Sequence, residues 1–187
     1  MASSTPAPAF RVSDRTLVGL CAVGTTNFVG CYAIAIALYP GGSWFDRHAS
    51  GHSLARNFLC DLMQARALNG EPAVVGSLLA RLGVVAMLLA LAAFYSLVAR
   101  LEGPPTHAGR ITQGAGWLAC VMGLAIPILT SDHHREAHIA SVLGAFVPSL
   151  VATIFALIIT LRVKGTSWWL RGAAVVTLVA GGIDGLL

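Results

Sequence analysis

The chain has 187 residues and a formal net charge of +4, and 56% of its residues are hydrophobic whereas only 11% are charged. Soluble domains carry about 25% charged residues, so this composition excludes an ordinary water-soluble protein and predicts an integral membrane protein surrounded by lipid. The basic residues are dispersed, without the dense run and interleaved aromatic residues of a nucleic-acid binder. We therefore expect no nucleic-acid partner.

Long apolar runs predict an all-α, polytopic transmembrane helical bundle. A helix that crosses the bilayer needs about 20 apolar residues, and its backbone polar groups are then satisfied internally. A chain of this length is expected to form one integral membrane domain, residues 1–187. We expect about five spans, near residues 17–38, 74–99, 114–130, 138–161 and 172–187.

The outer polar segment, residues 39–73, separates the first two predicted spans and is too long for a simple turn. The residues from Pro40 to Ser43 break regular structure at its beginning. Apolar residues, Trp44 and Phe58 among them, are mixed with polar ones in the remainder. The segment is predicted to form one or two short helices in the membrane interface.

The distribution of Lys and Arg predicts the orientation. With a cytoplasmic N-terminus, seven of these residues fall on the cytoplasmic side and five on the outer side, as the positive-inside rule favours. We expect the bacterial inner membrane, with the N-terminus in the cytoplasm. Residues 39–73, the turn at 131–137 and Asp184 then share the outer face.

Histidines and acids concentrate in the stretch from Asp132 to His138, between two apolar runs. Ionisable groups at membrane depth are costly and usually mark a functional site. His134 and His138 are four residues apart, a spacing that puts two imidazoles on one helical face, where both can reach one metal ion. His48 and His52 repeat the spacing. Hydrogen bonding or solvation at helix ends is the alternative for both pairs.

Three imidazoles and one carboxylate around an open position would form a hydrolytic zinc site. The predicted ligands are His134, His138 and one of His48 and His52, with Asp61 or Asp184 completing the set. A zincin motif is excluded, because Glu136 lies midway between its two histidines and faces away from them. Zn is therefore the expected cofactor if the protein is an enzyme.

Asp61 lies within an apolar stretch, where an unpaired acid would be costly. We expect Arg56, Arg66 or a histidine as its partner. On a continuous helix Asp61 would lie opposite His52, so the two can meet only if the segment bends. Asp184 lies among glycines that permit close helix approach.

The stretch from Ser53 to Leu62, SLARNFLCDL, resembles the DUF998 family of multi-pass membrane proteins. Its members show roughly S-x-x-x-N/T-x-x-S-E/D-L-G after the first span, and here Cys60 replaces the second Ser and Met63 the Gly. The family also shows P-x-D at the end of a later span and a His opening the next, similar to Pro127, Asp132 and His138. The resemblance implies that Asp61, Asp132 and His138 form a common polar core, but it implies no reaction.

A more distant similarity links the chain to intramembrane hydrolases of the alkaline ceramidase and progestin-receptor type. Those proteins pair H-x-x-x-H with a separate Ser, His and Asp, although they have seven spans and their order does not align with this chain. The similar residues here are His134, His138, Ser53, His52, and Asp61 or Asp184. The analogy implies catalytic roles for Ser53 and Asp61 on a lipid-like substrate, and Asp132 is a further catalytic candidate.

Two functional hypotheses follow. The first is a DUF998-like metal-dependent lipid or amide hydrolase, or a binder of a lipid-like molecule, with its polar His/Asp site at the outer mouth. The alternative is a non-catalytic subunit or ligand-binding module of a larger membrane complex, because small residues suit helix contacts with other membrane subunits. Those small residues are Gly24, Gly30, Gly114, Gly116, Gly181 and Gly182.

Overall fold

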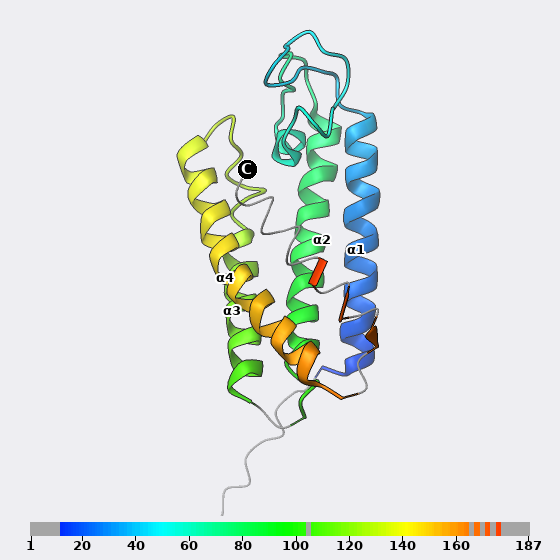
Figure 1. Cartoon of the computed structure of the whole chain (residues 1–187). Coiled ribbons are helices and arrows are strands. Elements are labelled where there is room, and N and C mark those ends of the chain that lie inside the picture. Colours follow the sequence, from blue (N-terminus) through cyan, green and yellow to red (C-terminus); the bar gives the residue numbers. More distant parts are fainter. Residues whose placement is uncertain (1–11, 104–105, 165–166, 169–170, 173–174, 177–187) are drawn as a thin grey trace, which may run out of the picture.

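The computed structural model describes residues 12–103, 106–164, 167–168, 171–172 and 175–176. In this part of the chain the regular structure is helical, which confirms the predicted all-α class. The helices lie lengthwise along the bundle, and the last long helix is inclined to the others (Figure 1). The outer polar segment is at one end, and we name that end the outer end of the bundle. They are α1 (Asp14–Ala37), η1 (Leu59–Met63), α2 (Val74–Val98), α3 (His107–Gly123) and α4 (Arg135–Arg162).

Three of these helices are long and apolar enough to cross a membrane. With a rise of 1.5 Å per residue, α1, α2 and α4 are roughly 36, 37 and 42 Å long, which exceeds the ~30 Å hydrocarbon core. Their bounds agree with three predicted spans to within a few residues. The helices support the prediction of an integral membrane protein.

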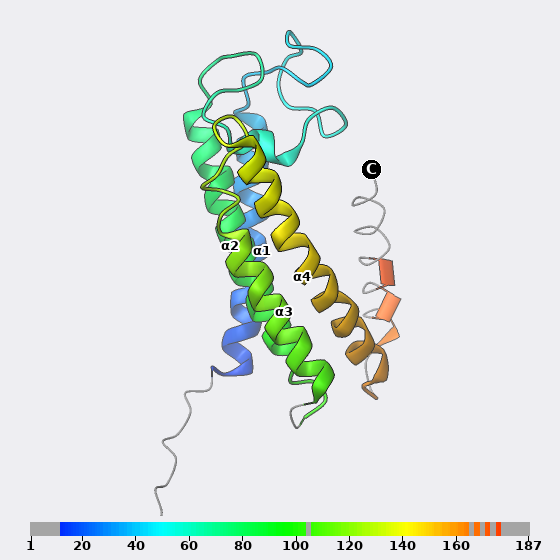
Figure 2. The ribbon, with the colours of Figure 1, turned by 90° about the vertical axis from the view of Figure 1, so that its left-hand side faces the viewer.

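The bundle is built from two antiparallel hairpins, α1 with α2 and α3 with α4. α2 lies between α1 and the second hairpin, and its direct contact with α4 is slight (Figures 1 and 2). Gly24 allows the close approach of α1 and α2, because an added Cβ would lie 2.5 Å from the carbonyl oxygen of Ala86. The two hairpins are therefore joined mainly by contacts between α2 and α3.

α3 differs from the predicted span at 114–130, since it begins at His107 and ends at Gly123. The Thr106 side chain caps its N-terminus by accepting a hydrogen bond from the Gly109 amide. Pro127 has no amide hydrogen to donate to the Gly123 carbonyl, and this lost hydrogen bond disfavours continuation of the helix. The chain then forms turns up to His134. This segment brings residues 130–134 over the outer end of α4.

The outer polar segment contains one described helix, the five-residue 3₁₀ helix η1. Leu62 and Met63 of η1 are almost fully buried in a cluster with Tyr32, Tyr39 and other residues of the outer ends of α1 and α2. The Arg81 side chain of α2 donates a hydrogen bond of 3.0 Å to the Met63 carbonyl oxygen, at the C-terminal end of η1. These contacts hold η1 at a fixed place on the bundle.

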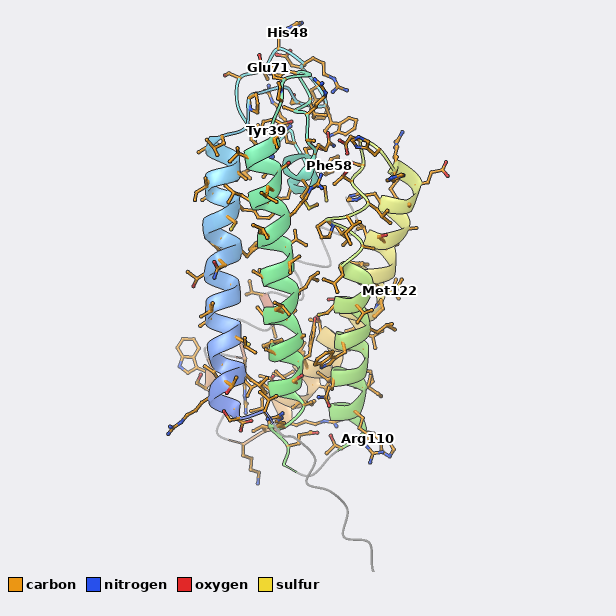
Figure 3. All side chains as sticks on the ribbon, turned by 180° about the vertical axis from the view of Figure 1, so that it is seen from behind. Tyr39, His48, Phe58, Glu71, Arg110 and Met122 are labelled. Atoms are coloured by element: carbon orange, nitrogen blue, oxygen red, sulfur yellow. The ribbon has the colours of Figure 1, made fainter. Side chains whose placement is uncertain are left out.

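Gly42 shapes the beginning of the outer segment. Its φ is 87°, and an added Cβ would overlap the backbone nitrogen of Asn69, so only glycine fits there. The backbone between Gly41 and Ser50 closes as an isolated antiparallel bridge. The segment is therefore a looped cap, as Figure 3 shows at the outer end, with His48 near its tip.

Candidate outer-cavity site

A cavity of about 670 Å³ lies between η1, the turn after α3 and the outer end of α4. Five of its lining residues share one face of α4, at helical spacings of three and four. They are Arg135, His138, Ile139, Val142 and Leu143. The remainder of the lining includes Trp44, Phe58, Cys60, Asp61, Gln64, Leu68, Ser131 and Asp132. The predicted polar core of Asp61, Asp132 and His138 therefore shares this cavity.

Asp61 is held by donors from its own segment. Its Oδ2 accepts hydrogen bonds from the Trp44 indole N–H at 3.0 Å and from the Phe58 amide at 2.9 Å. The second bond is half of a capping box, since Asp61 lies at the third position of η1 and bonds its N-cap residue. The acid is thus fixed by hydrogen bonds and not by the predicted Arg56 or Arg66.

Burial raises the pKa of the Asp61 carboxyl above its ordinary value, against the hydrogen bonds from Phe58 and Trp44, which lower it. The residue is only 2% exposed. Desolvation penalises the ionised form of a carboxyl group, and neighbouring donors offset only part of that penalty. Asp61 therefore takes up a proton more readily than an exposed aspartate.

His138 is buried in the first turns of α4, with 5% of its surface exposed. Its Nδ1 lies 2.7 Å from the carbonyl oxygen of Leu129. A carbonyl only accepts, so Nδ1 carries the proton and donates. In the neutral imidazole, Nε2 is then the hydrogen-bond acceptor or ligand atom that His138 can offer to the cavity.

Asp132 and Ser131 reach the cavity from the turn that precedes α4. An Asp132 carboxylate oxygen lies 3.0 Å from Nδ1 of His133. Burial raises the pKa of Asp132, but hydrogen bonds from Thr130 and His133 and the charge of His133 outweigh it, so the pKa is lowered overall. Asp132 thus contributes a negative charge beside the positive Arg135 on the same cavity wall.

Gln64 connects the two sides of the cavity. Its side-chain amide donates to Ser131 Oγ at 2.9 Å and more weakly to Asp61 Oδ1 at 3.4 Å. It is 6% exposed. The amide therefore couples the end of η1 to the turn after α3, across 67 residues of sequence.

The prediction that His48 and His52 share one helical face is wrong, because neither residue lies in a helix. His52 instead packs edge-on against Tyr39, with 5.3 Å between ring centroids, and its Nε2 lies 3.4 Å from the Phe58 carbonyl oxygen. The segment bends between His52 and Asp61, so both contact the backbone of Phe58. The sequence predicted that His52 and Asp61 could meet only if the segment between them bends, and the structure shows such a bend.

The other predicted site residues are not gathered in the cavity. His134 is the N-cap residue of α4 and is exposed, whereas His138 is buried. Ser53 forms a turn, in which its carbonyl oxygen accepts hydrogen bonds from the Arg56 and Asn57 amides. Asp184 lies outside the described residues.

The predicted zinc site depends on three or more ligands that meet. Among the residues that the structure describes, no three His, Cys, Asp or Glu side chains are close enough together to hold a metal ion. His138 and Asp132 share the cavity wall, while His48 is near the loop tip (Figure 3). The zinc site stays a prediction.

Sequence reasoning did not assign Trp44, Gln64, Ser131 or Arg135 to the site. Gln64 follows Asp61 by three residues, the spacing of one 3₁₀ turn, and this could have indicated a partner had the 3₁₀ helix been predicted. Trp44 was considered only as an apolar residue. Its indole N–H donates to Asp61, 17 residues further along the chain, a pairing that local sequence patterns do not indicate.

In comparisons with known proteins, no family model, no curated protein and no solved structure matches the chain.

Proposed function

We propose that this protein binds an amphipathic, lipid-like molecule in the outer cavity of a DUF998-like membrane bundle. The observation that carries the proposal is the distribution of groups around the cavity of about 670 Å³. Asp61, Asp132 and His138 line it together with Ile139 and Leu143. Ligand pockets commonly have ~300–1,000 Å³ and an apolar lining with few polar groups, and this cavity matches that description.

The polar groups favour a head that donates hydrogen bonds, such as an amine or a polyol. Two carboxylates and the Nε2 of His138 accept, and an ionised Asp132 attracts a cation. Arg135 adds one site for a phosphate or carboxylate, which guanidinium groups bind well. A zwitterionic head with an amine and a phosphate satisfies both kinds of group.

The proposal includes a membrane placement. Five spans, the fifth near residues 172–187, would cross the bacterial inner membrane with the N-terminus in the cytoplasm. The outer segment 39–73 and its helix η1 would then lie in the outer interface. Phe58 is 68% exposed and Phe45 is 82% exposed on this segment, and aromatic side chains are favoured in such interfaces.

Native mass spectrometry of the purified protein in a nonionic detergent tests the binding, with lysophosphatidylethanolamine as the probe. We expect His138→Gln and Asp132→Asn each to weaken binding about tenfold, because a hydrogen bond to a charged group contributes ~1.5–3 kcal/mol. His48→Gln is the matched control, since His48 does not line the cavity. Equal affinities in all four proteins would refute the proposal.

Zinc-dependent hydrolysis stays a prediction from the sequence, for which Nε2 of His138 is the available ligand atom. Elemental analysis of the purified protein tests it. Stoichiometric zinc that is lost in His138→Ala, but kept in a His107→Ala control, would support an enzyme that activates water on the metal. Zinc content that does not change between the two variants would count against a ligand role for His138.

The alternative, a non-catalytic subunit of a larger complex, also stays a prediction. Gly24 and Gly116 face other residues of this chain, whereas an added Cβ on Gly30 or Gly114 would meet none of the described residues within 4 Å. Small residues on an uncovered helix face favour contact with another helix. A Gly30→Leu variant that changes the mass of the detergent-solubilised particle, measured by light scattering, would favour this alternative.

A further inference from the structure

A second, partly open cavity of about 230 Å³ lies between α2, α3 and α4, next to the outer cavity. Val142 of α4 lines both cavities. The outer cavity meets α4 at His138, Ile139 and Val142, and the second meets it at Val142, Ala145, Phe146 and Ser149. Because these positions recur every three or four residues, one continuous face of α4 runs along both spaces.

The second cavity is apolar. α2 contributes Leu88, Leu91 and Tyr95 to its walls, and α3 contributes Ala119 and Cys120. None of its described lining residues is charged. It can therefore accept hydrocarbon, whereas a polar head would lose its hydration there without gaining a charged partner.

Tyr95 closes the end of the second cavity that is farthest from the outer cavity. Its hydroxyl is 3.1 Å from Ser149 Oγ and 3.0 Å from Thr153 Oγ1, both on α4. The residue is 2% exposed, and the absence of a side chain on Gly116 leaves room for its ring. The hydroxyl is thus satisfied by the protein, and the ring forms a fixed end to the apolar space.

We propose that the ligand is a single-chain amphiphile whose tail passes Val142 and ends against Tyr95, an inference that rests on the proposed function. The head occupies the outer cavity beside Asp132 and His138. From His138 to Ser149, α4 rises roughly 16 Å, which sets the length available to the tail. The small second cavity leaves no room for a second chain, so a diacyl lipid is not the preferred ligand.

The test compares hexanoyl and dodecanoyl lysophosphatidylethanolamine by native mass spectrometry. The short tail ends in the outer cavity, while the long tail must pass Val142. Ala145 lies three residues beyond Val142 on α4 and lines the second cavity but not the outer one. In Ala145→Trp the indole blocks the path of the tail, and the dodecanoyl probe is expected to bind at least tenfold more weakly while the hexanoyl probe binds as in the wild type. Each methylene group of the tail that remains in water, and is not buried in the second cavity, lowers the affinity by up to about fourfold.

Val147→Trp is the matched control, because Val147 is on the same helix, is 58% exposed and lines neither cavity. Leu91→Trp fills the second cavity from α2 and should reproduce the selective loss, even if Ala145→Trp does not fold. If both probes bind the two cavity variants as they bind the wild type, the tail assignment is overturned and the head site stands. If neither probe binds the wild type, the proposed function itself fails.

Discussion

The indole N–H of Trp44 donates a hydrogen bond of 3.0 Å to the carboxylate of Asp61, 17 residues further along the chain. The same oxygen accepts the amide of Phe58 at 2.9 Å. One buried acid thus connects the beginning of the outer segment to the N-terminus of η1. The wall of the outer cavity depends on this connection, because Trp44, Phe58 and Asp61 all line it.

Replacement of Asp61 by Ala is expected to lower the free energy of unfolding by about 1–3 kcal/mol, because donors in a covered place lose their acceptor. Asp61→Asn should cost less than about 1 kcal/mol, since its amide oxygen can still accept from Trp44 and Phe58. Denaturant titration of the purified protein in detergent measures both. Equal destabilisation by the two substitutions would show that the charge matters more than the hydrogen bonds.

His52 is expected to make stability depend on pH. Burial lowers the pKa of His52 below 6.5, against a hydrogen bond with Phe58 and the charge of Asp61, which raise it. The folded protein therefore binds this proton less readily than the unfolded chain. The contribution of His52 is complete above the unfolded pKa and is lost as the pH falls towards the folded value.

His52→Phe removes this titration while it keeps an aromatic ring beside Tyr39. Thermal unfolding between about pH 7.5 and 5.5, around the ordinary histidine pKa, should show a flatter profile for the variant than for the wild type. Asp61 acts in the opposite direction, because its raised pKa adds stability as the pH falls through the folded value. A wild-type profile parallel to that of His52→Phe would contradict the assignment to His52.

The long apolar runs made three helices predictable. Continuous hydrophobicity is a direct requirement of the bilayer, so the bounds of α1, α2 and α4 followed from the sequence. The end of α3 was placed too late, although Pro127 was recognised. The structure ends the helix at Gly123, four residues before Pro127, which has no amide hydrogen to donate.

The candidate site was predictable only in part. Asp61, Asp132 and His138 were identified as polar groups within apolar sequence, and they do line one cavity. The ligand role of the His48/His52 pair assumed a helix, yet backbone turns around Gly42 and Gly51 make this segment irregular. Tertiary contacts with α1 and α2 decide the path of such a segment, and local periodicity carries no information about them.

The hydrogen bond between Gln64 and Ser131 should couple η1 to the turn after α3. We expect a double-mutant cycle with Gln64→Leu and Ser131→Ala to give a coupling energy of about 0.5–1.5 kcal/mol, the usual net contribution of one hydrogen bond. The measurement is the free energy of unfolding of the four proteins in detergent. The control cycle uses Arg66→Leu in place of Gln64→Leu, because the Arg66 side chain donates to the Gly70 carbonyl oxygen of its own loop. A coupling of similar size in that cycle would refute the specific link.

Gly116 is expected to tolerate no side chain, because an added Cβ would overlap the ring of Tyr95. Gly116→Ala should therefore destabilise the bundle by about 1–3 kcal/mol, the usual cost of overpacking. It should also displace the Tyr95 hydroxyl from Ser149 and Thr153, and so enlarge or distort the second cavity. Gly114→Ala is the matched control on the same helix, where an added Cβ meets no described part of the chain within 4 Å. There the better helix propensity of alanine predicts no loss of stability, so a similar loss in both variants would mean that α3 is sensitive to any substitution and not to contact with Tyr95.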